Sequence, residues 1–250
     1  MIETTHLLLL LFLILASYIQ ASTGFAFALV VMSGVTAFDL APIEVTAFVV
    51  SFLSLINSSI GLQGRLWREV NKTALLYLLI PCVPATLGGV YLLAYFGDTQ
   101  LALLKFILGA CIIISSLAML LKVSKNQSPT GKIAYAISGV ISGLMGGMFA
   151  AFGPPMTYIM YRQSVSLQTI RATLLMAFTF TSIIRLAFVL MSQEVSPQAY
   201  YLSGIGIPVV ILATLSVRYF PLPISTQRMR QLVYFILFSS GLSLMLQAYI

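Results

Sequence analysis

Residues 143–155 read GLMGGMFAAFGPP and interrupt an apolar stretch that runs over residues 133–160. This stretch is too long for one comfortable membrane span, and it contains Gly146-Gly147 followed closely by Gly153-Pro154-Pro155. Because proline removes a backbone donor and glycine favours irregular backbone, the motif predicts a broken helix. The break at the glycine pair leaves two pieces of about a dozen residues, and each would reach about halfway across a bilayer.

A second stretch, residues 6–37, has the same character, with its predicted break at Gln20–Gly24. The chain is 60% hydrophobic and 8% charged, with a mean hydropathy of +1.03, which excludes a soluble domain of 250 residues. We therefore predict an all-α polytopic membrane protein. Six further stretches are long enough to cross about 30 Å as single helices; they are residues 45–63, 73–96, 100–121, 172–192, 199–217 and 231–249.

The charges indicate on which side of the membrane each polar gap lies. Basic loops stay on the cytoplasmic side. Eleven of the thirteen Lys and Arg residues fall in the gaps Arg65–Lys72, Lys122–Lys132, Arg162–Arg171 and Arg218–Arg230. Five of the six acidic residues lie in gaps that contain no Lys or Arg, namely Glu3, Asp39, Glu44, Asp98 and Glu194. This pattern predicts that both termini lie on the non-cytoplasmic side.

The same pattern predicts an internal symmetry. Residues 133–160 begin and end inside, so they must enter and return, as a re-entrant hairpin or as two short crossings. Residues 6–37 end outside and would also begin there. Each half then consists of a hairpin and three spans, giving about eight membrane segments in an inverted-topology repeat, a plan common among secondary transporters. We assign residues 1–125 to the first repeat and residues 126–250 to the second.

These features together resemble the TauE/SafE sulfite exporter family of membrane permeases. The resemblance covers nearly the whole chain and is most specific at Gly143–Pro155. It implies transport of small sulfur-containing or organic anions across the bacterial cytoplasmic (inner) membrane, with substrate loops at Ser22–Phe27 and Gly146–Pro155. The first loop departs from the family pattern, since Gly24 stands alone where a glycine cluster is usual and Met32-Ser33 stand where a proline is common.

The chemistry of the two loops also favours an anion. Facing hairpins would aim helix N-termini, with their partial positive charge and N–H donors, at one point near the midplane. Glycine allows close approach, and hydroxyl and amide groups add donors without a fixed charge, which is costly at mid-bilayer. The predicted substrate-binding residues are Gln20, Ser22, Thr23, Gly24, Phe25, Gly146, Gly147, Gly153, Pro154, Pro155, Thr157 and Arg185.

Other charged and small residues leave alternatives open. Lys105 is interpreted as snorkelling to the interface, whereas Arg185 either does the same or attracts the anion. Glu44 and Arg171 begin equivalent spans and are candidates for coupling, with interfacial caps as the alternative. Gly139 and Gly143 form small-xxx-small steps with Gly147 and have helix packing as their alternative role.

The sequence argues against several other functions. We find no intramembrane Ser/His pair, no His/Glu cluster and no Cys motif, so we expect no enzyme activity, no metal and no cofactor. The net charge of +7 fits cytoplasmic loops near anionic lipid, and we expect no nucleic-acid partner. The prediction is a secondary transporter of a sulfite- or sulfonate-like anion or a small organic acid, working by alternating access. An anion channel, a non-transporting subunit of a larger complex and a homo-oligomer stay open.

Overall fold

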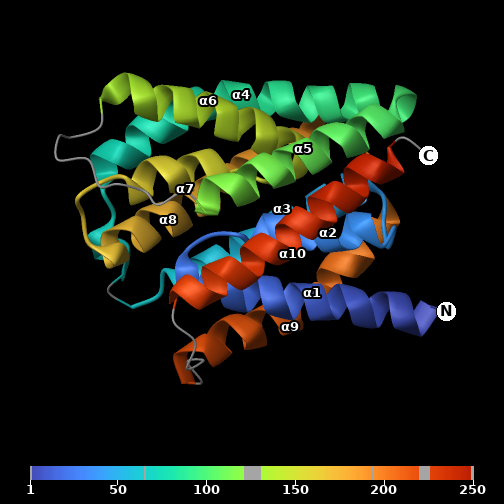
Figure 1. Cartoon of the computed structure of the whole chain (residues 1–250), viewed down its shortest axis with the longest axis horizontal. Helices are drawn as coiled ribbons and strands as arrows, with labels where there is room; N and C mark the ends of the chain where they lie inside the picture. Colours follow the sequence, from blue (N-terminus) through green and yellow to red (C-terminus); the bar gives the residue numbers. More distant parts are fainter. Residues whose placement is uncertain (1, 65, 121–130, 193, 220–225, 249–250) are drawn as a thin grey trace.

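The computed structural model is a bundle of helices, and it describes residues 2–64, 66–120, 131–192, 194–219 and 226–248 (Figure 1). The all-α fold class is therefore confirmed. The helices are α1 (Ile2–Thr23), α2 (Phe27–Ala37), α3 (Ile43–Gly61), the 3-10 turn η1 (Leu66–Glu69), α4 (Lys72–Thr99), α5 (Leu101–Leu120), α6 (Lys132–Phe149), α7 (Gly153–Tyr161), α8 (Leu167–Ser192), α9 (Pro197–Tyr219) and α10 (Thr226–Gln247).

Among the described residues, six helices are long and apolar enough to cross a membrane: α1, α3, α4, α6, α8 and α9. Four of them, α3, α4, α8 and α9, coincide with predicted spans. The other two predicted spans are the helices α5 and α10, whose described apolar stretches, residues 101–117 and 234–247, are shorter. The prediction that α1 and α6 reach only halfway is wrong, since each contains an apolar stretch of 18 residues.

The first helix break overlaps the end of its predicted position at Gly24, and the second lies a few residues after the predicted glycine pair. Helix α1 continues through Gln20 to Thr23, and the irregular segment is Gly24–Ala26. Helix α6 passes through Gly146-Gly147 without interruption and ends at Phe149. Ala150, which follows Phe149, takes a left-handed conformation with φ of 55°, and the next helix begins at Gly153, directly before the proline pair.

The glycines of α6 allow α4 to approach closely. A Cβ atom added at Gly139, Gly143 or Gly147 would collide with a backbone carbonyl oxygen of α4, from Leu78, Cys82 and Thr86 respectively. Both sets of residues are spaced by four, so they run along facing ridges of the two helices. The packing alternative is therefore confirmed for Gly139 and Gly143, and Gly147 has the same role.

The helix contacts follow a two-fold pattern. Helix α1 packs on α9, and the corresponding helix α6 packs on α4. In the same way α3 packs on α9, and α8 packs on α4. Helix α3 also packs on α8, and α5 on α10 (Figure 1). Each of these contacts maps onto itself or onto another when α1–α5 are exchanged with α6–α10.

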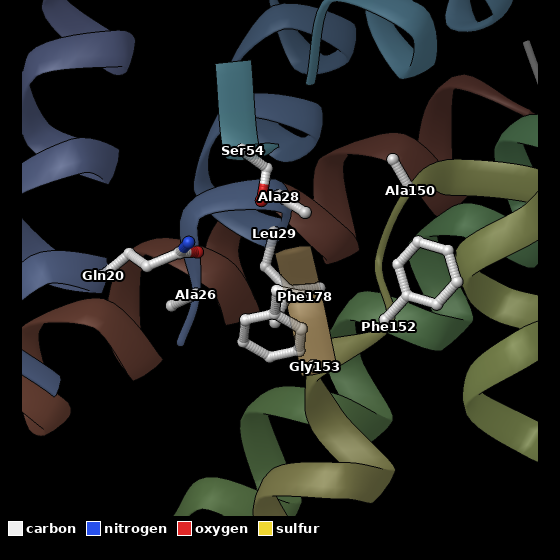
Figure 2. Close-up of a pocket in the computed structure, with 9 residues that line it drawn as sticks. All are labelled: Gln20, Ala26, Ala28, Leu29, Ser54, Ala150, Phe152, Gly153 and Phe178. Atoms are coloured by element: carbon white, nitrogen blue, oxygen red, sulfur yellow. The ribbon is translucent and has the colours of Figure 1, made fainter. Parts of the chain in front are cut away.

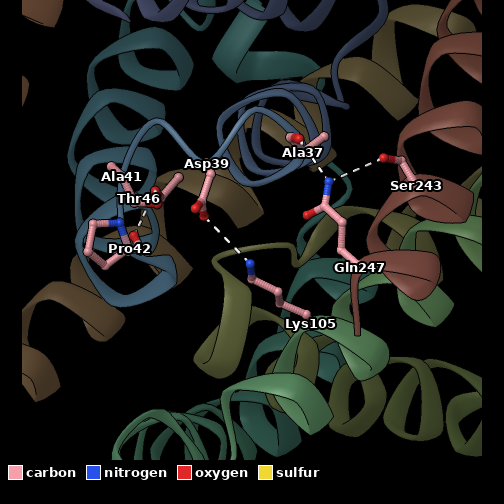
Figure 3. Close-up of polar contacts among 8 residues, drawn as sticks. All are labelled: Ala37, Asp39, Ala41, Pro42, Thr46, Lys105, Ser243 and Gln247. Atoms are coloured by element: carbon pink, nitrogen blue, oxygen red, sulfur yellow. Dashed lines mark hydrogen bonds and ion pairs between the residues drawn. The ribbon is translucent and has the colours of Figure 1, made fainter. Parts of the chain in front are cut away.

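Helices α5 and α10 hold the end of the first hairpin (Figure 3). Gln247 Nε2 on α10 donates to the carbonyl oxygen of Ala37 at 3.1 Å. Lys105 Nζ on α5 lies 3.5 Å from Asp39 Oδ1 on the α2–α3 loop, and the Asp39 side chain is 82% exposed. An exposed ion pair contributes about 0–1 kcal/mol. Lys105, interpreted from sequence as snorkelling, thus has a partner within the protein.

Candidate functional site

The two helix breaks border one small pocket (Figure 2). Its empty volume is about 280 Å³, including its open side. The lining comes from both hairpins and from α3 and α8, and it consists of Gln20, Ala26, Ala28, Leu29, Ser54, Ala150, Phe152, Gly153 and Phe178. Segments more than a hundred residues apart in the chain therefore meet around one pocket.

Polar side chains of α1 hold the first break in position. Gly24 and Ala26 have φ of 86° and 84°, and for alanine this left-handed conformation is strained. Thr23 Oγ1 donates to the carbonyl oxygen of Ile19 at 2.7 Å, and it lies 3.2 Å from that of Phe25. The single Thr23 hydroxyl hydrogen is therefore used inside the break and is not offered to the pocket in this conformation.

The start of α2 forms a donor-rich wall of the pocket. The first N–H groups of a helix have no partner within it. In α2 the N–H of Phe27 donates to Gln20 Oε1 at 3.2 Å, and Gln20 Nε2 donates to Ser58 Oγ at 3.0 Å. The next two N–H groups belong to Ala28 and Leu29, which line the pocket. The positive end of the α2 dipole therefore faces the pocket.

The start of α7 offers fewer donors than the sequence suggested. Pro154 and Pro155 occupy the second and third positions of this helix and have no N–H group. Of the first three positions only Gly153, which lines the pocket, can donate. Figure 2 shows Gln20 on one side of the pocket and the ring of Phe152 on the opposite side, with Phe178 between them. The pocket is thus polar at α2 and largely apolar at α7 and α8.

Of the predicted substrate-binding residues, Gln20 and Gly153 line the pocket. The Phe152 ring covers Gly146, and Gly147 packs against α4. Thr157 is buried on α7, and its hydroxyl has no hydrogen-bond partner among the described residues. Six predicted residues lie close to the breaks without lining the pocket: Ser22 and Thr23 at the end of α1, Gly24 and Phe25 in the first break, and Pro154 and Pro155 in α7.

Arg185 is 1% exposed and lies between three helices. Its Nε donates to the carbonyl oxygen of Gly147 on α6 at 3.0 Å. Its Nη1 donates to the carbonyl oxygen of Ala47 and to Ser51 Oγ on α3, both at 3.0 Å. The guanidinium therefore makes its hydrogen bonds inside the protein, next to the second hairpin and outside the pocket wall.

The two coupling candidates occupy different surroundings. Glu44 is half-buried in the first turn of α3, and its carboxylate fills the space that a side chain at Gly97 of α4 would need. Arg171, near the start of α8, packs against the first break, with its Cα and Cγ 3.1 Å from a Cβ built on Gly24. Arg171 is thus near the pocket, whereas Glu44 contacts the end of α4.

Sequence reasoning missed several lining residues as individuals. Ala26, Ala150 and Phe152 fall within the loops that the family resemblance indicated, so the irregular segments themselves were the signal. Ser54 and Phe178 lie inside long regular helices, where nothing in the local sequence distinguishes them from other core residues.

The comparisons with known proteins agree on one family. The family model "Sulfite exporter TauE/SafE" matches residues 9–244. The "Probable sulfite/organosulfonate exporter TauE" of Cupriavidus necator is 35% identical over 236 residues, which cover 93% of this chain and 90% of the relative. No solved structure matches the chain. With six membrane-spanning candidate helices and a family match over nearly its whole length, the chain belongs to the TauE/SafE sulfite exporter family of membrane transporters.

Proposed function

We propose that the protein is a secondary transporter that moves sulfite or a small organosulfonate across the bacterial inner membrane by alternating access. A small organic acid is the other substrate class that fits. The observation that carries the proposal is the pocket between the two helix breaks, with the N-terminus of α2 and the Gln20 amide in its wall. The C. necator relative carries the description "Probable sulfite/organosulfonate exporter TauE", which supports both the substrate class and the outward direction.

The chemistry of the pocket supports an anion with a small apolar part. Backbone N–H groups at a helix N-terminus bind oxyanions without a fixed charge. The α2 side of the pocket offers the N–H groups of Ala28 and Leu29, while Phe152 and Phe178 give the other side an apolar surface. A sulfonate group would lie against α2 and its hydrocarbon part against the rings. Sulfite would use the same donors without the apolar contacts.

The two-fold pattern of helix contacts supports an inverted repeat and alternating access. Helix pairs α3–α8 and α5–α10 pack each helix against its own counterpart, while the hairpins α1–α2 and α6–α7 each border the pocket. Exchanging the conformations of two such repeats would open the pocket alternately to each side. Helix α1 begins and α10 ends at the same end of the bundle, which we assign to the non-cytoplasmic side (Figure 1).

Counterflow in proteoliposomes tests the proposed function. Vesicles with the purified protein and a high internal concentration of unlabelled ethanesulfonate should transiently accumulate labelled ethanesulfonate from a dilute external solution. A channel would equilibrate the label without this overshoot. Uptake equal to that of protein-free vesicles would contradict transport, and equilibration without an overshoot would contradict alternating access.

The proposed sidedness gives a separate prediction. In a background of Cys82→Ala and Cys111→Ala, single cysteines at Leu40 or Val195 should react with an impermeant thiol reagent added to intact cells. Cysteines at Trp67 or Ser166 should react only after the membrane is permeabilised. Labelling at positions 67 and 166 from outside would contradict the assignment of the four basic gaps to the cytoplasm.

A further inference from the structure

Two arginines lie on one face of α8, one on each side of the pocket residue Phe178. Arg171, Phe178 and Arg185 are spaced by seven residues. Seven residues rotate around the helix axis by about 20° less than two full turns. They therefore project from nearly the same face, in steps of about 10 Å along the helix axis. Phe178 lines the pocket, so one cation lies about two turns before the pocket and the other about two turns after it.

Each arginine contacts a different hairpin, Arg171 at the first break and Arg185 just ahead of the second. Arg171 packs on Gly24, two residues before the pocket-lining Ala26. Arg185 donates to the carbonyl oxygen of Gly147, three residues before the pocket-lining Ala150. Along α8 the pocket therefore lies between two arginines, and each of them contacts a different hairpin.

Neither arginine has an acidic partner in the part of the chain that the structure describes. The ion pair found among the described residues joins Lys105 and Asp39, so it involves neither arginine. Arg185 donates to two carbonyl oxygens and a hydroxyl, and all three of these acceptors are neutral. Arg171 is half-buried, and its Nε is buried without a hydrogen-bond partner. Permanent charges inside a membrane protein are costly unless an opposite charge compensates them, and a transported anion would do so.

We propose that Arg171 binds the anion on the inner side of the pocket. Arg171 and Arg185 are then two successive cationic positions along α8, and the anion passes Phe178 as it moves from one to the other. This inference rests on the proposed transport function. It gives Arg171 contact with the substrate through its unpartnered Nε–H. Arg185 connects the second hairpin to the anion path. It donates to Gly147 of that hairpin and to Ser51, which lies one turn from the pocket-lining Ser54 on α3.

Binding and stability measured together test the proposal. For each purified variant, the dissociation constant of ethanesulfonate is measured by titration, and the unfolding temperature is measured without and with the anion. Arg171→Gln should weaken binding about tenfold or more, since a charged hydrogen bond is lost. Its unfolding temperature without anion should be unchanged or higher, because an uncompensated charge is removed. Arg171→Lys should bind within about threefold of the wild type.

Arg162→Gln is the matched control, because it removes a cation from the same polar gap. Arg162 lies at the end of α7, with its guanidinium 5.7 Å from the centre of the Tyr158 ring. This variant should bind ethanesulfonate as the wild type does. An equal loss of affinity in Arg162→Gln would overturn the proposal, since it would reduce the effect to surface charge in general.

A second variant applies if Arg171→Gln does not fold. Arg171→Cys, in the background without Cys82 and Cys111, is purified and then modified with either an aminoethyl or an ethyl thiosulfonate reagent. The aminoethyl group should restore affinity and the ethyl group should not. Equal affinity after both modifications, or wild-type affinity in Arg171→Gln, would overturn the role of Arg171. A wild-type protein that neither binds nor transports ethanesulfonate would instead contradict the proposed function.

Discussion

The Gln20→Glu variant should bind ethanesulfonate and sulfite at least about a hundredfold more weakly than the wild type. The two side chains have the same shape, and a carboxylate oxygen of the introduced glutamate can still accept from the N–H of Phe27. The substitution adds a negative charge to the wall of the pocket. Two like charges about 4 Å apart repel by about 4 kcal/mol at an effective dielectric constant of 20. Transport at low substrate concentration should fall by the same factor.

Initial rates of counterflow over a range of ethanesulfonate concentrations measure this effect. Gln198→Glu is a matched control, because it makes the same change at an exposed position near the start of α9, outside the pocket lining. This control should keep wild-type kinetics. Unchanged apparent affinity in Gln20→Glu would remove the first hairpin from the binding site.

Gly147→Leu should lose most of its folded, membrane-inserted protein. A side chain at this position would collide with the carbonyl oxygen of Thr86 and come within 2.7 Å of the Gly89 Cα, both in α4. Because these are backbone atoms, no side-chain rotation relieves the contact. Overpacking of this kind costs about 3 kcal/mol or more. The sequence predicted Gly147 as a substrate-binding residue, and the structure places it against the backbone of α4.

The expected losses are in detergent-extracted yield and in unfolding temperature, followed by fluorescence-detected size exclusion. Gly204→Leu provides the control, since Gly204 of α9 is exposed and a Cβ there meets no atom within 4 Å. It should keep the wild-type elution profile. If Gly147→Leu were as stable as Gly204→Leu and only transport were lost, the glycine would belong to the anion path after all.

The sequence predicted the membrane class, most helix bounds and the two interrupted stretches, because hydropathy, loop charge and Gly/Pro chemistry act locally. The predicted span 45–63 corresponds to α3 at Ile43–Gly61, and the span 73–96 to α4 at Lys72–Thr99. The length of the hairpin arms could not be predicted in the same way. Glycine both breaks and packs helices, and only the structure shows that Gly146-Gly147 continues a helix in which Gly147 packs against α4.

The site depends on tertiary contacts that sequence patterns do not encode. Gln20 was predicted as a ligand donor, and the structure adds that its amide caps α2 and contacts Ser58. Arg185 was interpreted from sequence either as snorkelling to the interface or as attracting the anion, yet it is buried among α3, α6 and α8. Phe178 was not singled out, since its place in the pocket follows from how α8 crosses both hairpins.

Substrate protection of a cysteine in the pocket tests the central claim most directly. Ala28→Cys, in the background without Cys82 and Cys111, places a thiol in the pocket wall at the start of α2. We predict that ethanesulfonate at ten times its dissociation constant slows modification by a small anionic thiosulfonate reagent about tenfold. A cysteine at Leu40, on the α2–α3 loop outside the pocket lining, should react at the same rate with and without ethanesulfonate. If ethanesulfonate saturates transport by Ala28→Cys but leaves its modification rate unchanged, the pocket between the two helix breaks is not where the anion binds.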